Sequence, residues 1–236
     1  MMPCKNEHGQ TIGDAVPNWK VPSQPEKITL IGNHGRLEPL VVAKHADDLY
    51  AAFKPCVHNG DWTFLRIEPF QSVEQWQKFI EERVKLKHIV NFAVIDNLSS
   101  KAVGMIALDP IDSPNGVIEV GSVFFSPLMK NSILSTEVQY LLMAYVFDKL
   151  SFRRYQWKCN SLNISSWKAA ERLGFTYEGT FRNFEITKGR NRDTAWFSVI
   201  NNEWPKLKTA FQAWLDSSNF YECGRQVKKL TDFRKD

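Results

Sequence analysis

The order of apolar and polar positions along this 236-residue chain predicts alternating strands and helices. Short apolar runs bounded by turn residues predict strands over 28–31, 37–42, 89–95, 102–108, 117–125, 154–159, 176–186 and 194–200. Apolar residues at helical spacing predict helices over 45–53, 72–86, 133–150, 163–173 and 204–215. This order predicts an α+β fold of the α/β-sandwich type, in which a mixed sheet has helices on both faces.

The two ends of the chain differ from this pattern. Residues 1–26 contain four prolines and little periodicity, which predicts an extended N-terminal arm, with Trp19 packing on the body. Residues 27–216 then form one domain. Residues 217–236 carry clustered lysine and arginine, which predicts a solvated basic C-terminal tail.

Composition narrows the class of protein. A hydrophobic content of 43% supports one substantial core, and a net charge of +4 argues against a dedicated nucleic-acid binder. No apolar run has the length of a membrane span. The four cysteines are far apart and form no CxxC pair, which favours a reduced, cytoplasmic protein. The histidines show no zinc-ligand spacing, so no metal site is expected.

Two helix starts offer candidate chemistry. The helix over 133–150 follows a strand, and its free N–H groups and positive dipole end could hold a phosphate. The second start carries Asn163 and Ser166, which in isolation read as an ordinary helix cap. Helical spacing places Ser166 beside Ala169 and Ala170 on the inward face, where small side chains leave room for a thin, extended ligand.

Residues 154–193 closely resemble the end of the acyl-CoA-binding half of GNAT acetyltransferases, in the branch of the ribosomal-protein-alanine N-acetyltransferases. The likeness is carried by Asn163-x-x-Ser166 and by the runs at 169–175, 178–182 and 189–193, and it extends more weakly over 28–204. The resemblance implies the GNAT fold, acetyl-CoA as cosubstrate and no metal. It implies transfer of the acetyl group to a primary amine, either a protein N-terminal α-amine or a small-molecule amine. The amine would attack directly, without a covalent acyl-enzyme.

The resemblance also assigns roles to residues of this chain. The following residues are expected to bind the cofactor: Phe124, Phe125, Lys130, Asn131, Ser132, Ser135, Thr136 and Asn163. A backbone N–H of the phenylalanine pair is expected to stabilise the oxyanion. Family members carry two glycines where this chain has Lys130 and Ser132, so an ordinary helix start is the alternative. Glu137 in the first turn would repel a phosphate.

Three residues are expected to act in catalysis. The resemblance implies that Ser166 protonates the leaving thiolate and that Glu185 or Glu119 is the base, although each glutamate is otherwise a solvated strand residue. Cys159 is rejected as a nucleophile because the motif pairs no histidine with it. Residues 54–69, rich in aromatics, are expected to form an acceptor-side loop. The alternative function is a catalytically weak acyl-CoA-binding or protein-interaction module. The acceptor and the oligomeric state stay open.

Overall fold

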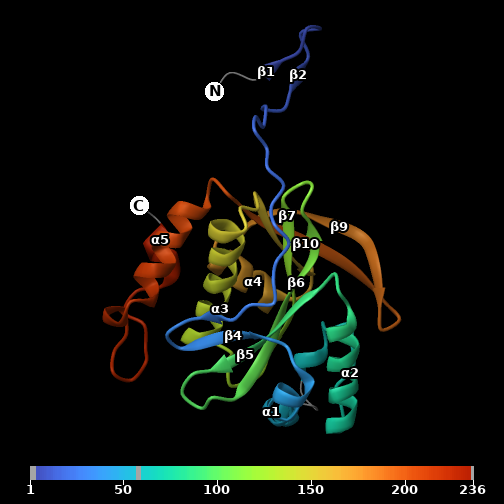
Figure 1. The fold of residues 1–236 in the computed structure, drawn as a ribbon, viewed down its shortest axis with the longest axis vertical. Coiled ribbons are helices and arrows are strands. Elements are labelled where there is room, and N and C mark those ends of the chain that lie inside the picture. The colour runs from blue at the N-terminus through green and yellow to red at the C-terminus, as the bar shows by residue number, and fades with distance from the viewer. Residues whose placement is uncertain (1–3, 57–59, 235–236) are drawn as a thin grey trace.

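The computed structural model describes residues 4–56 and 60–234, and its centre is a mixed sheet of eight strands (Figure 1). The strand order is β3-β4-β5-β6-β7-β8-β10-β9, and every neighbouring pair is antiparallel except β7 with β8. The strands are β3 Leu30–Ile31, β4 Gly35–Pro39, β5 Val90–Asp96, β6 Ala102–Asp112, β7 Val117–Phe125, β8 Arg154–Asn160, β9 Thr176–Thr187 and β10 Arg190–Ile200. Residues 57–59 of the expected acceptor-side loop and 235–236 of the tail lie outside the described residues.

Helices cover both faces of this sheet, which confirms the predicted fold class (Figure 1). One face carries α1 Val42–Phe53 and α2 Val73–Lys85 and is called the α1 face below. The other, the α3 face, carries α3 Ile133–Ala144, α4 Ile164–Leu173 and α5 Trp204–Leu215. A π-helical turn, Tyr145–Lys149, extends α3 to the predicted length. None of the helices in the described residues is long and apolar enough to cross a bilayer.

Each face has its own buried cluster, because side chains alternate along the strands. In β5, Phe92 and Val94 lie in the α3-face cluster, whereas Ala93 and Ile95 lie in the α1-face cluster. The α1-face cluster is rich in aromatic rings. Within it, Trp76 packs edge-to-face on Trp62, with ring centroids 6.3 Å apart.

Helix α1 begins at Val42, three residues before the predicted start. Its N-cap residue, Val41, is extended and has no side-chain oxygen to cap the helix. Instead His45 Nδ1 accepts a hydrogen bond from the backbone N–H of Val41 at 3.1 Å. This reciprocal contact lacks the usual Ser, Thr, Asp or Asn signal, so the start could not be read from the sequence.

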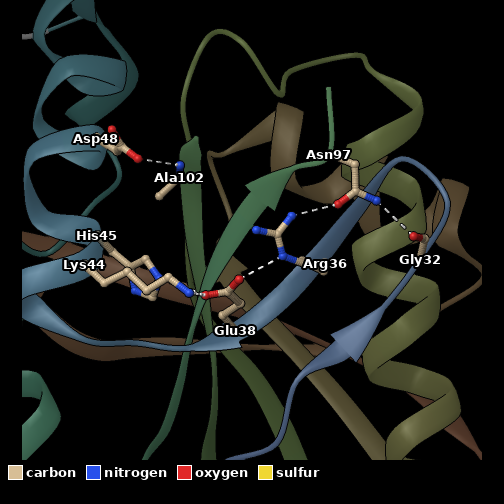
Figure 2. A network of polar contacts seen from close by, with 8 residues as sticks. All are labelled: Gly32, Arg36, Glu38, Lys44, His45, Asp48, Asn97 and Ala102. Atoms are coloured by element: carbon tan, nitrogen blue, oxygen red, sulfur yellow. Dashed lines mark hydrogen bonds and ion pairs between the residues drawn. The ribbon is translucent and has the colours of Figure 1, made fainter. Parts of the chain in front are cut away.

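The same histidine belongs to a buried polar network that ties β4 to α1 (Figure 2). Glu38 accepts hydrogen bonds from Lys44, from Arg36 Nε at 2.8 Å and contacts His45 Nε2 at 3.2 Å. Burial opposes ionisation of Glu38, but these three partners lower the pKa of its carboxyl to about 2. Arg36 also donates to Asn97 Oδ1 at 3.0 Å, which joins the β5–β6 turn to the network.

Part of the N-terminal arm and part of the C-terminal segment pack on the body. The arm carries a small hairpin, β1 Cys4–Lys5 with β2 Thr11–Ile12, away from the sheet (Figure 1). Behind it, Trp19 Nε1 donates to the Pro114 carbonyl at 3.1 Å. The C-terminal segment is folded and not solvated as expected, because Leu230 is only 1% exposed and joins the α3-face cluster. The short helices of this segment are Ser217–Asn219 and Leu230–Arg234.

Candidate active site

The central feature of the site is the parting of β7 and β8. The two strands pair only over three positions, and Glu119 with Gln156 is the last of them. Beyond that point β7 continues along β6 while β8 continues along β10. A gap therefore opens in the middle of the sheet, and in the described part of the chain no strand pairs there with the β8-facing edge of β7.

A bulge in β7 makes this parting possible. The register with β6 shifts between Ala107 and Met105, and Ser122 takes a left-handed φ of 49°. The Ser122 hydroxyl accepts a hydrogen bond from Arg83 Nη2 at 2.7 Å, which ties the bulge to α2. A bulge adds one residue to one strand and increases its local twist, so it turns β7 away from β8.

The bulge also reverses which side chains face which side. Before it, Val120 belongs to the α3-face cluster, and after it Val123 and Phe125 pack on that same cluster. Phe124 faces the α1 side. Strict alternation along the strand would place Val120 and Phe124 on one face. The extra residue explains the difference.

A cavity of about 1770 Å³ occupies the gap and the starts of α3 and α4. Nine of the predicted site residues are among those that line it: Phe124, Phe125, Lys130, Asn131, Ser132, Ser135, Thr136, Asn163 and Ser166. Glu119 and Glu185 are not among its lining residues. The structure therefore brings together the expected cofactor-binding residues from two loops that lie some thirty positions apart in the chain.

The loop before α3 has a left-handed residue even though it lacks the family glycines. Asn131 adopts φ 58°, and Asn is one of the few non-glycine residues that tolerates this region. Ser132 then caps the helix, since its Oγ accepts from the Ser135 N–H at 3.2 Å and donates to the Met129 carbonyl at 2.6 Å. Lys130 forms an ion pair with Asp61 of the expected acceptor-side loop.

Glu137 does not face a ligand at this helix start. Its carboxylate is 3% exposed and accepts hydrogen bonds from the backbone N–H groups of Asn33, His34 and Gly35, at 2.8, 2.8 and 2.9 Å. Three donors aimed at one carboxylate offset its charge inside the fold. Because these N–H groups belong to the β3–β4 turn and offset the negative charge of Glu137, the expected repulsion of a phosphate at the helix start is weakened.

Ser166 lies on the α3 face of the gap. Asn163 is the N-cap of α4, and its Oδ1 accepts from the Ser166 N–H at 3.1 Å. The Ser166 hydroxyl accepts from Trp157 Nε1 at 3.1 Å. Cys159 neighbours the same hydroxyl, and burial raises the pKa of its thiol, as expected of an inert core cysteine.

Glu119 lies on the opposite face of the gap. Its partners on β8 are Gln156, with Nε2 at 3.4 Å, and Lys158, with Nζ at 3.3 Å. These alternate with Trp157 and Cys159, so strand pleating separates Glu119 from Ser166. Glu119 is 3% exposed, and burial raises the pKa of its carboxyl to about 7, against the opposing effect of Lys158. Sequence reasoning missed both partners, whose signal was the alternation of polar and apolar residues along β8.

Glu185 has a different environment on the edge strand β9. It is partly exposed and forms ion pairs with Arg66 Nη2 at 2.6 Å and with Arg192 Nη1 at 3.7 Å. Nearby, Lys188 Nζ donates to the Trp62 carbonyl at 3.0 Å. The β9–β10 hairpin therefore contacts the described part of the acceptor-side loop, and the ion pair of Glu185 with Arg66 is one of these contacts.

The C-terminal segment contributes residues that sequence reasoning assigned to solvent. Arg225, Lys229 and Leu230 are among the residues that line the cavity, as is Arg172 of α4. Gln139 of α3 also lines it. Among the described residues, no three His, Cys, Asp or Glu side chains gather in a group that could hold a metal ion.

Comparisons with known proteins agree with this geometry. The acetyltransferase (GNAT) domain model matches residues 36–176. A GCN5-related N-acetyltransferase from Brucella melitensis is 45% identical, covers 93% of this chain and 99% of its own, and superposes with a TM-score of 0.91. An uncharacterized N-acetyltransferase of Bacillus licheniformis, p20, is 29% identical over 60% of this chain and 80% of its own. The microcin C7 self-immunity acetyltransferase MccE, solved with acetyl-CoA and AMP, shares the fold at 20% identity, a TM-score of 0.64 and coverage of 72% and 93%.

Proposed function

The chain belongs to the GNAT family of N-acetyltransferases, and from that premise we propose that it transfers the acetyl group of acetyl-CoA to a primary amine by direct attack. The observation that carries this proposal is Glu119, a buried carboxyl with a pKa of about 7 at the last paired position before β7 and β8 separate. A base with a pKa near the working pH suits the removal of a proton from an amine.

The two faces of the gap give donor and acceptor separate approaches. The acetyl-CoA lies on the α3 face, with its phosphates at the start of α3 and its thioester between the strands near Ser166. The amine enters from the α1 face, past the aromatic side chains of Trp62 and Phe64. The relative MccE, solved with acetyl-CoA and AMP, supports this choice of donor.

The reaction then follows from the positions of these groups. The amine nitrogen attacks the thioester carbonyl, and its proton passes to the Glu119 carboxylate, directly or through one water. The oxyanion accepts a hydrogen bond from a β7 backbone N–H after the bulge, at Phe124 or Phe125, where no β8 strand competes for it. The carbon–sulfur bond breaks, and the CoA thiolate takes the Ser166 hydroxyl proton, which solvent replaces.

An α-amine is the acceptor that depends least on a general base to remove its proton. Its reference pKa near 7.7–8.0 leaves about a tenth to a fifth neutral at pH 7, whereas a lysine amine near 10.4 is almost fully protonated. This favours a protein N-terminus or an amino-acid-like amine, as in the branch of ribosomal-protein-alanine N-acetyltransferases that the motifs resemble.

Replacing Glu119 tests the mechanism. Glu119→Gln should remove the rise in rate that accompanies ionisation near pH 7 and lower kcat/KM by roughly 10²-fold, the usual contribution of a general base. The measurement is CoA thiol release against pH with a panel of peptides, polyamines and amino acids. Glu185→Gln is the matched control, because that carboxylate is already held by Arg66.

Three outcomes contradict parts of the proposal. If only the Glu185→Gln variant lost the rise in rate near pH 7, Glu185 would be the base. An unchanged profile in both variants would remove both glutamates. Tight acetyl-CoA binding by the wild-type protein without turnover of any amine would favour the alternative, an acyl-CoA-binding module.

A further inference from the structure

The folded C-terminal segment adds basic side chains to the cavity from outside the region that the family model matches. These residues, Arg225 and Lys229, are called the basic wall below. That model ends at residue 176, whereas Arg225 and Lys229 come from the segment after α5 and still line the cavity. The segment is held in place by Asn219, which is 5% exposed and donates through Nδ2 to the Trp214 and Lys228 carbonyls, at 3.0 and 3.2 Å. The wall is therefore a fixed part of the fold.

Cations gather at this wall without matching carboxylates. Among the described residues, neither Arg172, Arg225 nor Lys229 forms an ion pair with a carboxylate. Burial and the nearby positive charge of Arg234 lower the pKa of the half-buried Arg172. Arg172 Nη2 donates to Thr136 Oγ1 at 2.6 Å, which fixes its guanidinium beside α3. Arg172 and Arg234 thus bring like charges together, while Arg225 and Lys229 line the same cavity, and this arrangement favours an anionic ligand.

A buried amide on the wall of the same cavity is also unsatisfied. Gln139 is 1% exposed, lines the same cavity, and neither its Nε2 nor its Oε1 has a hydrogen-bond partner among the described residues. A buried amide without partners is unfavourable, and a ligand with hydrogen-bond donors and acceptors would remove this cost. The amide of Gln139 suits a ribose hydroxyl or the edge of a base.

The spacing along α3 decides which part of the donor would reach this wall. Gln139 lies seven residues after Ser132, so it is about 10 Å further along the helix axis at 1.5 Å per residue. A diphosphate at the helix start cannot fill both places. The CoA nucleotide carries a second phosphate on its ribose, one sugar away from the diphosphate.

We propose that Arg225 and Lys229, together with Arg172, bind the ribose 3′-phosphate of the acetyl donor, with Gln139 contacting the adjoining nucleoside. The proposal rests on the proposed function, since it assumes acetyl-CoA as donor. It also accounts for a helix start that lacks the family glycines: part of the donor's charge is held by a segment far away in the chain.

Calorimetric titration with acetyl-CoA and with 3′-dephospho-acetyl-CoA tests the assignment. The wild-type protein should bind acetyl-CoA about tenfold more tightly than 3′-dephospho-acetyl-CoA, as expected for charge-assisted contacts to one phosphate. Arg225→Gln and Lys229→Gln should each reduce that ratio several-fold and leave the affinity for the dephospho form unchanged. Added salt should reduce the wild-type ratio.

Lys228→Gln is the matched control. Its side chain lies 5.9 Å over the Phe233 ring and is not among the lining residues, yet the variant changes net charge by the same amount. Unliganded thermal midpoints should stay unchanged, because Arg225 and Lys229 are exposed. If each variant bound both ligands equally more weakly, or if the affinity ratio stayed unchanged in both test variants, the inference would be wrong. Neither result would contradict the proposed function. A wild-type protein that binds neither ligand would instead refute the proposed function.

Discussion

At the scale of single residues, the hydroxyl groups of the cavity differ in how their hydrogen bonds are already used. Ser132 and Ser135 donate to the Met129 and Ser132 carbonyls, so their protons stabilise the helix start. Ser166 accepts a bond from Trp157 Nε1, which leaves it oriented by the core of the protein. A donor group that is oriented before the substrate arrives needs little reorganisation during the reaction.

Ser166→Ala should therefore affect the chemical step more than binding. We expect kcat to fall at least tenfold while the Kd for acetyl-CoA changes less than threefold, with about 1 kcal/mol lost in stability because the Trp157 indole N–H loses its partner. Single-turnover kinetics and equilibrium titration measure the two effects. Ser165→Ala is the control for loss of a hydroxyl at the same helix start, since Ser165 also lines the cavity but its exposed hydroxyl donates to Asn163 Oδ1. Equal losses in kcat and affinity would make Ser166 a binding residue.

At the scale of elements, α3 joins three parts of the molecule. Its first turn lines the cavity, its Glu137 holds the β3–β4 turn, and its Thr136 holds Arg172 of α4. The β3–β4 turn in its turn places His34 on the cavity wall. A substitution on the buried side of α3 should therefore alter the cavity as well as the free energy of unfolding.

Glu137→Gln tests this role. The amide offers one acceptor oxygen, whereas the two carboxylate oxygens accept from three backbone N–H groups, so we expect a loss of roughly 2–3 kcal/mol in the free energy of unfolding. Urea denaturation measures it. Glu81→Gln, an exposed position of α2, should change stability by less than about 0.5 kcal/mol. If both variants unfold at the same urea concentration as the wild type, the turn does not depend on this carboxylate.

At the scale of the whole molecule, the sheet separates two cores, and the C-terminal segment packs against one of them. The C-terminal segment returns to α4 and α5, where Leu230 enters the α3-face cluster and Arg234 Nη2 donates to the Glu171 carbonyl at 3.1 Å. Residues beyond the family model thus stabilise the helix that carries Ser166.

Leu230→Ala should destabilise the protein by about 2–5 kcal/mol, the usual cost of removing a buried leucine side chain. Thermal unfolding should show a lower midpoint, and acetyl-CoA should restore part of it, since ligand binding favours the folded state. Val227→Ala is the control, because Val227 is 49% exposed. A Leu230→Ala midpoint within one degree of wild type would show that the segment is not part of the core.

Local patterns in the sequence account for much of this architecture. Helical spacing and the glycine at 174 predicted α4, and short apolar runs bounded by turn residues predicted β5 to β8 within a few residues. These features depend on hydrogen bonds and side-chain periods that repeat over fewer than about ten residues, so they can be read along the chain. The motif at Asn163 and Ser166 belongs to the same class, because both residues lie in one helix turn.

Other features depend on contacts between distant residues. The burial of Glu119, and with it the raised pKa of its carboxyl, requires β8 alongside β7. The basic wall requires the last residues of the chain to pack on α4. Linear patterns carry the tendency of each segment, but the local dielectric around a charge and the walls of a cavity exist only once separate segments have packed together.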